Sequence, residues 1–220
     1  MNLLYPSMMC VKPAQTETIC RIFEETGIAG LHIDIMDGSF VPNFTLGTDY
    51  CRYLHAASSL PLDIHLMIDR PEDKLTWFPI QEGDIVSIHA ESTNHLGRAV
   101  ERVRALGGIP YAAINPATPI SAVEDILPAL GGVLVMTVNP GFAGQKLIDY
   151  TIPKIARLRR MLEDAGFPGM PIEVDGNVSA PNLVRMKAAG ADSFVIGSSG
   201  FLKTSDPDTI RSGIREFAEL

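Results

Sequence analysis

The sequence is poor in cysteine, tryptophan and positive charge. Its 220 residues include three cysteines and one tryptophan, and 18 Lys and Arg residues against 26 Asp and Glu give a formal net charge of −8. Binding nucleic acids through their phosphates needs clustered cations, so we expect no nucleic-acid partner. Cys10, Cys20 and Cys51 cannot all pair and form no C-x-x-C motif, so we expect reduced thiols in a cytoplasmic protein.

Long apolar runs are also missing. A helix needs about 20 apolar residues to span a bilayer, and no run in the sequence approaches that length. The first residues, MNLLYPSMMC, contain no basic segment, and Pro6 interrupts their short apolar stretch. We therefore expect neither a targeting segment nor a membrane partner. Hydrophobic residues still make up 46% of the chain, which is ample for a buried core.

Short apolar runs alternate with longer amphipathic segments along the whole chain. Near-continuous runs rich in Val, Ile, Leu and Met are typical of parallel strands that are buried on both faces. The runs that predict strands are Leu3–Met8, Gly30–Ile35, Leu62–Ile68, Ile85–His89, Ile109–Ile114, Val133–Val138, Ile172–Asp175 and Ser193–Gly197.

Helical patterns lie between these runs. Weak patterns follow the second, third and fifth runs, and the clear ones are Thr16–Thr26, His95–Leu106, Ile152–Ala165, Pro181–Ala189 and Pro207–Ala218. Eight strand–helix units predict an α/β fold, a single (β/α)8 TIM barrel over residues 1–220. An open doubly wound sheet is the alternative, but it usually carries a glycine-rich fingerprint after its first strand, and this chain has none there.

Polar side chains stand near the predicted strand ends, where the active sites of such barrels lie. His32 and Asp34 alternate on one strand and therefore point to the same face. A carboxylate within an apolar run needs a partner, which a divalent metal shared with His65 and Asp175 would supply. Such a mixed ligand set leaves Zn, Fe, Mn, Co and Mg open. The alternative is that both histidines are hydrogen-bonded core residues.

Asp34 and Asp175 also form a candidate acid–base pair. They lie on the predicted second and seventh strands, so they face each other across much of an eight-stranded barrel. A planar intermediate between them would meet one carboxylate on each face, which suits inversion of a stereocentre while a metal stabilises the enediolate. The alternative is that the two carboxylates only bind a metal.

Glycine-rich turns follow the last three predicted strands. These are Gly141-Phe142-Ala143-Gly144, Gly176 and Gly197-Ser198-Ser199. Barrels commonly bind phosphate in this region, and glycine lets the backbone approach a ligand closely. A single G-x-x-G is equally consistent with a plain turn. Three methionines near strand ends are either core residues or an apolar lid over the site: Met36, Met67 and Met136.

The absence of lysine at key positions argues against two further classes of enzyme. None of the six lysines ends a predicted strand, so a Schiff-base aldolase would lack its nucleophile. Asp34-Ile35-Met36-Asp37 has methionine where the D-x-K-x-x-D motif of sugar-phosphate decarboxylases requires lysine. Two alternatives to an epimerase stay open: a lyase on a related phosphate-binding barrel, and a non-catalytic barrel that binds a metabolite.

Five segments of the chain resemble the ribulose-phosphate 3-epimerase family. They are Leu31–Gly38, Phe40–Asn43, Asp63–Met67, Met136–Gln145 and Ile172–Gly176. The resemblance extends over essentially the whole chain. It implies a barrel of the ribulose-phosphate-binding type that interconverts ketose phosphates epimeric at C3 with one divalent metal. It also implies a homo-oligomer, since barrels of this family are often dimers or hexamers.

The resemblance assigns roles residue by residue. It implies a metal bound by His32, Asp34, His65 and Asp175, with Asp34 as proton acceptor and Asp175 as donor. Ser7 matches a serine that contacts the substrate, and His65 also faces it. The remaining positions match phosphate-binding backbone, neighbouring loop residues and methionines over the site: Gly141, Phe142, Ala143, Gly144, Gly176, Asn177, Gly197, Ser198, Met36, Met67 and Met136.

Within the family, three segments lean towards the hexulose branch, which is similar to D-allulose-6-phosphate 3-epimerase. They are Pro6–Cys10, Met136–Gln145 and Gly197–Leu202. Two positions depart from the family pattern, namely Ser39, where histidine is usual, and Asn177, where a second glycine is common. Both lie on predicted rim loops, so the exact sugar, a ketopentose or a ketohexose phosphate, stays open.

Overall fold

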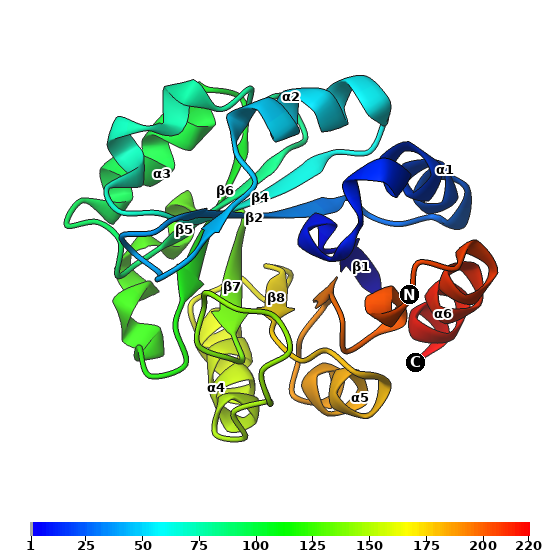
Figure 1. Cartoon of the computed structure of the whole chain (residues 1–220). Helices are drawn as coiled ribbons and strands as arrows, with labels where there is room; N and C mark the ends of the chain where they lie inside the picture. The colour runs from blue at the N-terminus through cyan, green and yellow to red at the C-terminus, as the bar shows by residue number, and fades with distance from the viewer. Residues whose placement is uncertain (1) are drawn as a thin grey trace.

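The chain folds around a sheet that closes into a barrel, as the computed structural model shows for residues 2–220. Nine strands lie in the order β1-β9-β8-β7-β6-β5-β4-β2-β3, and all neighbours are parallel except β2 and β3. The ring closes between β1 and β2, where Ser7 forms a parallel bridge with His32 and the N–H of Ala29 donates to the Leu4 carbonyl at 3.1 Å. The predicted TIM-barrel fold is therefore confirmed (Figure 1).

Each predicted apolar run corresponds to one strand of the barrel, with shifted ends. The run that begins at Leu3 leaves the sheet after Pro6, because Met8–Cys10 turns into a short 3-10 helix. The second strand is longer than expected, since its last two residues pair with the short antiparallel β3. The strands are β1 Leu3–Pro6, β2 Leu31–Asp37, β3 Phe44–Thr45, β4 Leu62–Met67, β5 Ile85–His89, β6 Ile109–Ile114, β7 Gly132–Met136, β8 Ile172–Asp175 and β9 Ser193–Ile196.

Helices surround the barrel (Figure 1). The first ends where predicted because Gly27 adopts a left-handed conformation with φ 75°, which terminates a helix. Asp206 caps the last one by accepting a hydrogen bond from the Thr209 N–H. The α-helices are α1 Thr16–Thr26, α2 Thr48–Ala57, α3 Leu96–Ala105, α4 Thr151–Asp164, α5 Ala180–Ala188 and α6 Pro207–Glu219.

The weak helical patterns after the third and fifth predicted strands do not form α-helices within residues 2–220, so these two predictions were wrong. In the structure, β4 and β6 are followed by short 3-10 segments, Pro71–Asp73 and Leu75–Trp77 in the first case and Ile120–Ala122 and Glu124–Ala129 in the second. Proline explains part of this difference, because Pro128 lies inside the last segment and cannot donate a backbone hydrogen bond.

The barrel interior is filled at the amino-terminal ends of the strands. Tyr5, Ile85 and Tyr111 pack together there, each at most 8% exposed. Tyr111 lies so close to Gly132 that a Cβ at that glycine would be 2.3 Å from the ring. Because this end is filled by side chains, a small molecule can reach the interior only from the carboxyl ends.

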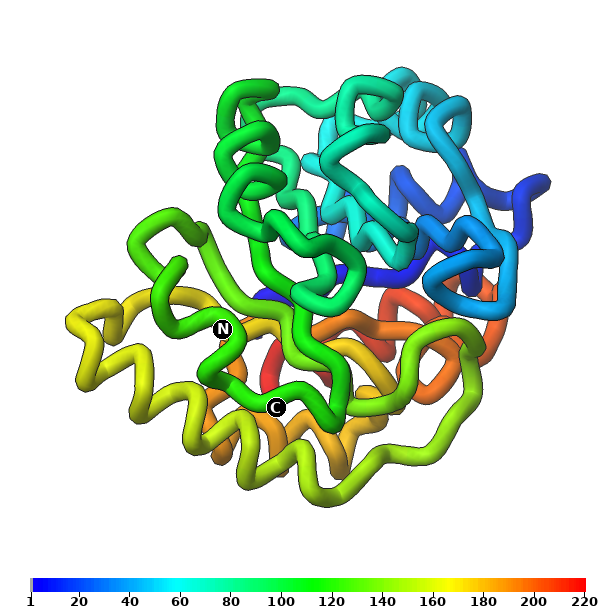
Figure 2. The backbone as a smooth tube through the Cα atoms, turned by 90° about the vertical axis from the view of Figure 1, so that its left-hand side faces the viewer, coloured from blue at the N-terminus to red at the C-terminus, as the bar shows by residue number. Residues whose placement is uncertain are grey.

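The loops after β2 and β7 meet at that carboxyl end. Figure 2 shows both at the same end of the barrel, the first in blue and the second in yellow-green. The side chain of Asn43 donates to the carbonyl of Gly141 at 2.8 Å, which ties the two loops together. The rim is therefore held by direct contacts between loops that are far apart in the sequence.

Candidate metal and active site

A cleft opens at the carboxyl ends of the strands. Asp34 and Asp175 lie on its floor. His65 and His32 are fully buried below them. The other positions singled out as substrate-binding all line this cleft, namely Ser7, Met36, Met67, Met136, Gly141, Phe142, Ala143, Gly144, Gly176, Asn177, Gly197 and Ser198.

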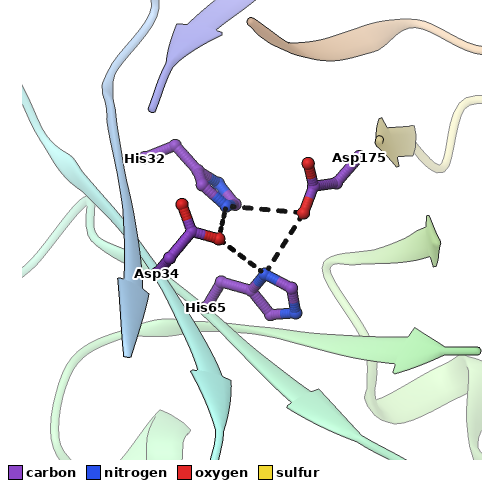
Figure 3. A group of neighbouring side chains, drawn as sticks. All are labelled: His32, Asp34, His65 and Asp175. Atoms are coloured by element: carbon purple, nitrogen blue, oxygen red, sulfur yellow. Dashed lines mark ion pairs between the residues drawn. The ribbon is translucent and has the colours of Figure 1, made fainter. Parts of the chain in front are cut away.

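The four candidate metal ligands converge below the cleft (Figure 3). Nε2 of His32 is 3.4 Å from Oδ1 of Asp34 and 4.0 Å from Oδ2 of Asp175. Nδ1 of His65 is 3.6 Å and 3.5 Å from the same two oxygens. One atom from each residue thus belongs to a group whose members all lie within 4.8 Å of one another.

The residues present fit a divalent metal ion. His32 Nε2 and His65 Nδ1 are buried and have no hydrogen-bond partner among residues 2–220. Ligands about 2.0–2.2 Å from one tetrahedral ion are roughly 3.3–3.6 Å apart, close to most of the separations between these atoms. A bound cation would therefore satisfy both orphaned nitrogens and offset the buried carboxylate of Asp34 and the partly exposed one of Asp175, whose isolation would otherwise be costly.

The other nitrogen of each of these two histidines has a protein partner. Nδ1 of His32 is 2.5 Å from Oδ2 of Asp63, and Nε2 of His65 is 2.8 Å from Nε2 of His89. Nδ1 of His89 in turn lies 3.2 Å from Oε2 of Glu91. Such outer partners orient metal-binding imidazoles.

The roles of these outer residues are not predicted from the sequence. Asp63 stands two residues before His65, and the i, i+2 alternation along that strand could have placed both inside the barrel. The same reasoning applies to His89 and Glu91, although Glu91 follows the strand rather than lying within it. Which inward-facing groups touch depends on the barrel's register, and that is a tertiary property.

The site divides its carboxyl groups into ionised and neutral ones. Burial opposes ionisation of Asp34, yet His32 and His65 hold its pKa well below the usual range. Burial raises the pKa of Glu173 well above its usual value, and the nearby carboxylate of Asp63 adds to this shift. Glu173 is therefore held neutral next to Asp63, the partner of the candidate metal ligand His32.

Ser7 and Thr45 hold Asp34 in place. The hydroxyl of Ser7 donates to Oδ2 of Asp34 at 2.6 Å, while Thr45 donates to the Asp34 backbone carbonyl at 2.6 Å. Oδ2 is therefore engaged by Ser7, and Oδ1 is the oxygen that faces the histidines. Asp175 is less enclosed, with 17% of its side chain exposed against 7% for Asp34.

The turn after β8 is built on a glycine that no other residue could replace without strain. Gly176 has φ 122°, and a Cβ there would lie 2.8 Å from the Val138 nitrogen and 2.9 Å from the Thr137 hydroxyl. The next residue, Asn177, also has a positive φ of 50°, a conformation that asparagine tolerates. Its amide donates to the Gln145 carbonyl at 2.6 Å, so it connects this turn to the loop after β7.

Several residues that line the cleft were not predicted from the sequence to be site residues. They include Met9, Cys10, Asn139, Gln145 and Val195. Ser39, one of the two departures from the family pattern, is exposed and does not line the cleft. Its N–H donates to Oδ1 of Asp37, which helps to shape the rim.

A closed parallel barrel with a polar cleft at the carboxyl ends of its strands defines an enzyme of the TIM-barrel class. The family described as "Ribulose-phosphate 3 epimerase family" matches residues 3–201 of the chain. The chain belongs to that family. Its members are divalent-metal-dependent isomerases that act on sugar phosphates, and the chain is accordingly a ketose-phosphate 3-epimerase.

Two relatives illustrate this similarity. The chain is 40% identical to the chloroplastic ribulose-5-phosphate-3-epimerase of Arabidopsis thaliana over 201 residues, covering 90% of this chain and 71% of the relative. It is 38% identical to the ribulose-phosphate 3-epimerase of Bacillus subtilis over 194 residues, covering 88% and 89%. Both matches therefore extend over most of each chain.

A solved structure supports the fold alone. A mutant tryptophan synthase alpha-subunit from Pyrococcus furiosus aligns with a TM-score of 0.70 at 13% identity, covering 100% of this chain and 98% of the other. Within residues 2–220, no helix combines the length and the apolar character that crossing a bilayer would require.

Proposed function

We propose that the chain inverts C3 of a ketopentose or ketohexose phosphate with Asp34 and Asp175 as the acid–base pair and a divalent metal held by His32, Asp34, His65 and Asp175. The convergence of these two carboxylates and two unpartnered imidazole nitrogens below one cleft carries the proposal. A cluster of this kind is costly in a protein interior unless a cation is bound.

The two carboxylates divide the proton transfers. Asp34, held ionised by its neighbours, accepts the C3 proton, and Asp175 delivers a proton to the opposite face of the planar intermediate. A divalent metal held by these residues would supply positive charge that offsets the negative charge developing on the substrate when the C3 proton is removed. Ser7 keeps Oδ2 of Asp34 oriented through its hydrogen bond.

The rest of the cleft positions the sugar phosphate. Backbone N–H groups of Gly141–Gly144, Gly176 and Gly197-Ser198 hold the phosphate, which needs no lysine or arginine. Phe142 is 54% exposed at the rim, whereas Met36, Met67 and Met136 are nearly buried and line the inner part of the cleft. These three methionines keep water away from the reacting carbon.

Two sugars are candidates. The segments Pro6–Cys10, Met136–Gln145 and Gly197–Leu202 favour D-allulose 6-phosphate, with D-fructose 6-phosphate as its epimer. The names of the curated relatives favour D-ribulose 5-phosphate, with D-xylulose 5-phosphate as its epimer. We propose the hexulose phosphate as the preferred substrate. We also propose that the rim residue Asn177 affects whether a hexulose or a pentulose phosphate is preferred. We further expect a cytoplasmic homo-oligomer whose protomer is one barrel.

The test follows C3 epimerisation of both sugars in parallel, after the metal has been stripped and after each of Zn, Fe, Mn, Co and Mg has been added back. We expect stoichiometric metal, loss of activity on stripping and recovery on add-back. A clear preference for ribulose 5-phosphate would overturn the hexulose assignment. Absence of bound metal and of C3 proton exchange would instead indicate a non-catalytic barrel, and cleavage of a carbon–carbon bond would indicate a lyase.

A further inference from the structure

The two histidines of the candidate metal site have different kinds of partner on their outer nitrogens. His32 has a carboxylate partner, Asp63, directly on its outer nitrogen. His65 has another histidine, since its Nε2 is 2.8 Å from Nε2 of His89. Two imidazole nitrogens at this distance form a hydrogen bond only if one carries the proton and the other is bare. The direction of this bond must therefore be set by something outside the pair.

Glu91 is the group that can set it. Its Oε1 accepts hydrogen bonds from the backbone N–H of Asn115 at 2.8 Å and from the hydroxyl of Thr118. Its Oε2 lies 3.2 Å from Nδ1 of His89. Although burial opposes it, these hydrogen bonds lower the pKa of Glu91 to about 2, so the group is an acceptor-only carboxylate at neutral pH.

The proton positions then follow one from another. An acceptor-only Glu91 requires the proton of His89 on Nδ1, which leaves Nε2 of His89 bare. A bare Nε2 requires the proton of His65 on Nε2, which leaves Nδ1 of His65 bare. That nitrogen is the one that lies 3.6 Å from Asp34 and 3.5 Å from Asp175 and has no hydrogen-bond partner.

We propose that Glu91 is a positioning residue that sets the tautomer of His65 through His89, so that Nδ1 of His65 presents its lone pair to the metal. The proposal rests on the metal site proposed above. It adds a residue that is two hydrogen bonds away from that site and touches neither the metal nor the substrate.

Packing keeps this chain of contacts fixed. His89 is fully buried, its Nε2 edge contacts His65, and its ring contacts that of Phe40 at a centroid distance of 4.9 Å. The far end is also anchored, because the carbonyl of Asn115 accepts a hydrogen bond from the buried Lys154 at 2.6 Å. Since the His89 side chain is fully buried, exchanging its two nitrogens by rotation would disturb the core.

The isosteric substitution Glu91→Gln distinguishes this role from simple charge compensation. The amide oxygen introduced by Glu91→Gln must face the N–H of Asn115, which can only donate. The amide NH₂ of the same side chain then faces Nδ1 of His89 and favours the opposite tautomer of His89. The proton of His65 is in turn favoured on Nδ1, where it blocks the metal. Glu91→Ala leaves His89 Nδ1 free of any opposing donor and is therefore the milder change.

The experiment has two readouts. Long-range ¹H–¹⁵N correlation spectra assign the tautomers of the five histidines in the wild-type protein, metal-free and zinc-loaded, and in metal-free Glu91→Gln. Zinc affinity is measured by competition with a chelator for the wild type, Glu91→Gln and Glu91→Ala. The exposed Glu124→Gln is the matched control for loss of one carboxylate.

We expect His89 protonated on Nδ1 in the wild type and on Nε2 in Glu91→Gln, with zinc affinity reduced about 10–100-fold in Glu91→Gln and less in Glu91→Ala. A wild-type His89 protonated on Nε2 overturns the proposal without any variant having to fold. Weaker zinc binding without a tautomer change also overturns it. A wild type that binds no zinc at all would instead contradict the proposed function.

Discussion

Asp34 and Asp175 come from strands β2 and β8 and hold one oxygen each at nearly equal distances from Nδ1 of His65, 3.6 Å and 3.5 Å. Their surroundings are nonetheless different. Asp34 is enclosed and accepts a hydrogen bond from Ser7, whereas the side chain of Asp175 is 17% exposed to the cleft. Two carboxylates in unequal environments can hold different protonation states, which an acid–base pair requires.

Replacing either carboxylate by its amide should stop turnover. Asp34→Asn and Asp175→Asn keep the shape of the side chain but remove the group that exchanges the C3 proton, so we expect kcat to fall by about 10³-fold or more in each. The measurement is epimerisation at saturating metal, with metal content determined in parallel. Asp125→Asn, on an exposed segment, is the control. Near-normal activity of either site variant would show that the two-carboxylate mechanism is wrong.

Removing the hydroxyl of Ser7 should weaken catalysis without unfolding the protein. A hydrogen bond to a charged group contributes about 1.5–3 kcal/mol, so Ser7→Ala should lower kcat/KM by about 10–100-fold. Ser87→Ala is a matched control, because the buried Ser87 hydroxyl has no hydrogen-bond partner. Equal kinetic effects of the two substitutions would contradict a role for Ser7 at Asp34.

Asn177→Gly should affect substrate binding more than turnover. Glycine accepts the positive φ of this position but cannot accept from the Asn182 amide or donate to the Gln145 carbonyl. The second loss removes the side-chain hydrogen bond that Asn177 makes from the turn after β8 to the loop after β7. We expect KM and the inhibition constant of inorganic phosphate to rise about three- to tenfold, with kcat within twofold, since the lost hydrogen bond contributes about 1 kcal/mol. An unchanged KM, or a loss confined to kcat, would argue against this role.

Asp37 should contribute to stability in a pH-dependent way. Burial opposes its ionisation, but the N–H groups of Phe40, Asp69 and Ser39, together with Lys74, lower the pKa of Asp37 to about 2 from an ordinary value of 3.8. The unfolded chain therefore binds more protons between these values, so this stabilisation is complete above about pH 4 and disappears as the pH falls towards 2.

The variant Asp37→Asn should make that contribution measurable. We expect its free energy of unfolding in urea to be about 1–3 kcal/mol below the wild-type value at pH 6, and the difference to shrink at pH 3 and below. Asp73→Asn, at a side chain that is 65% exposed, should show almost no difference at either pH. A deficit for Asp37→Asn that does not change with pH would contradict the assignment.

Local sequence predicts most of the barrel because each strand is an apolar run bounded by turn residues. Helix α1 matches its predicted bounds because Gly27 supplies a local stop signal. The short strand β3 could not be predicted, since only its pairing with the end of β2 makes it a strand. The helical patterns after β4 and β6 failed because their periodicity is weak and proline interrupts the second of them.

The candidate site also has one part that the sequence predicts and another that only the tertiary structure determines. The alternation of His32 and Asp34, and the motifs that contain His65 and Asp175, pointed to the candidate metal ligands and the candidate acid–base pair from the sequence. The tertiary structure alone decided how Asp63, His89 and Glu91 support them. These contacts join neighbouring strands and loops whose register is set when the sheet closes, and no local pattern records which inward-facing side chains will then touch.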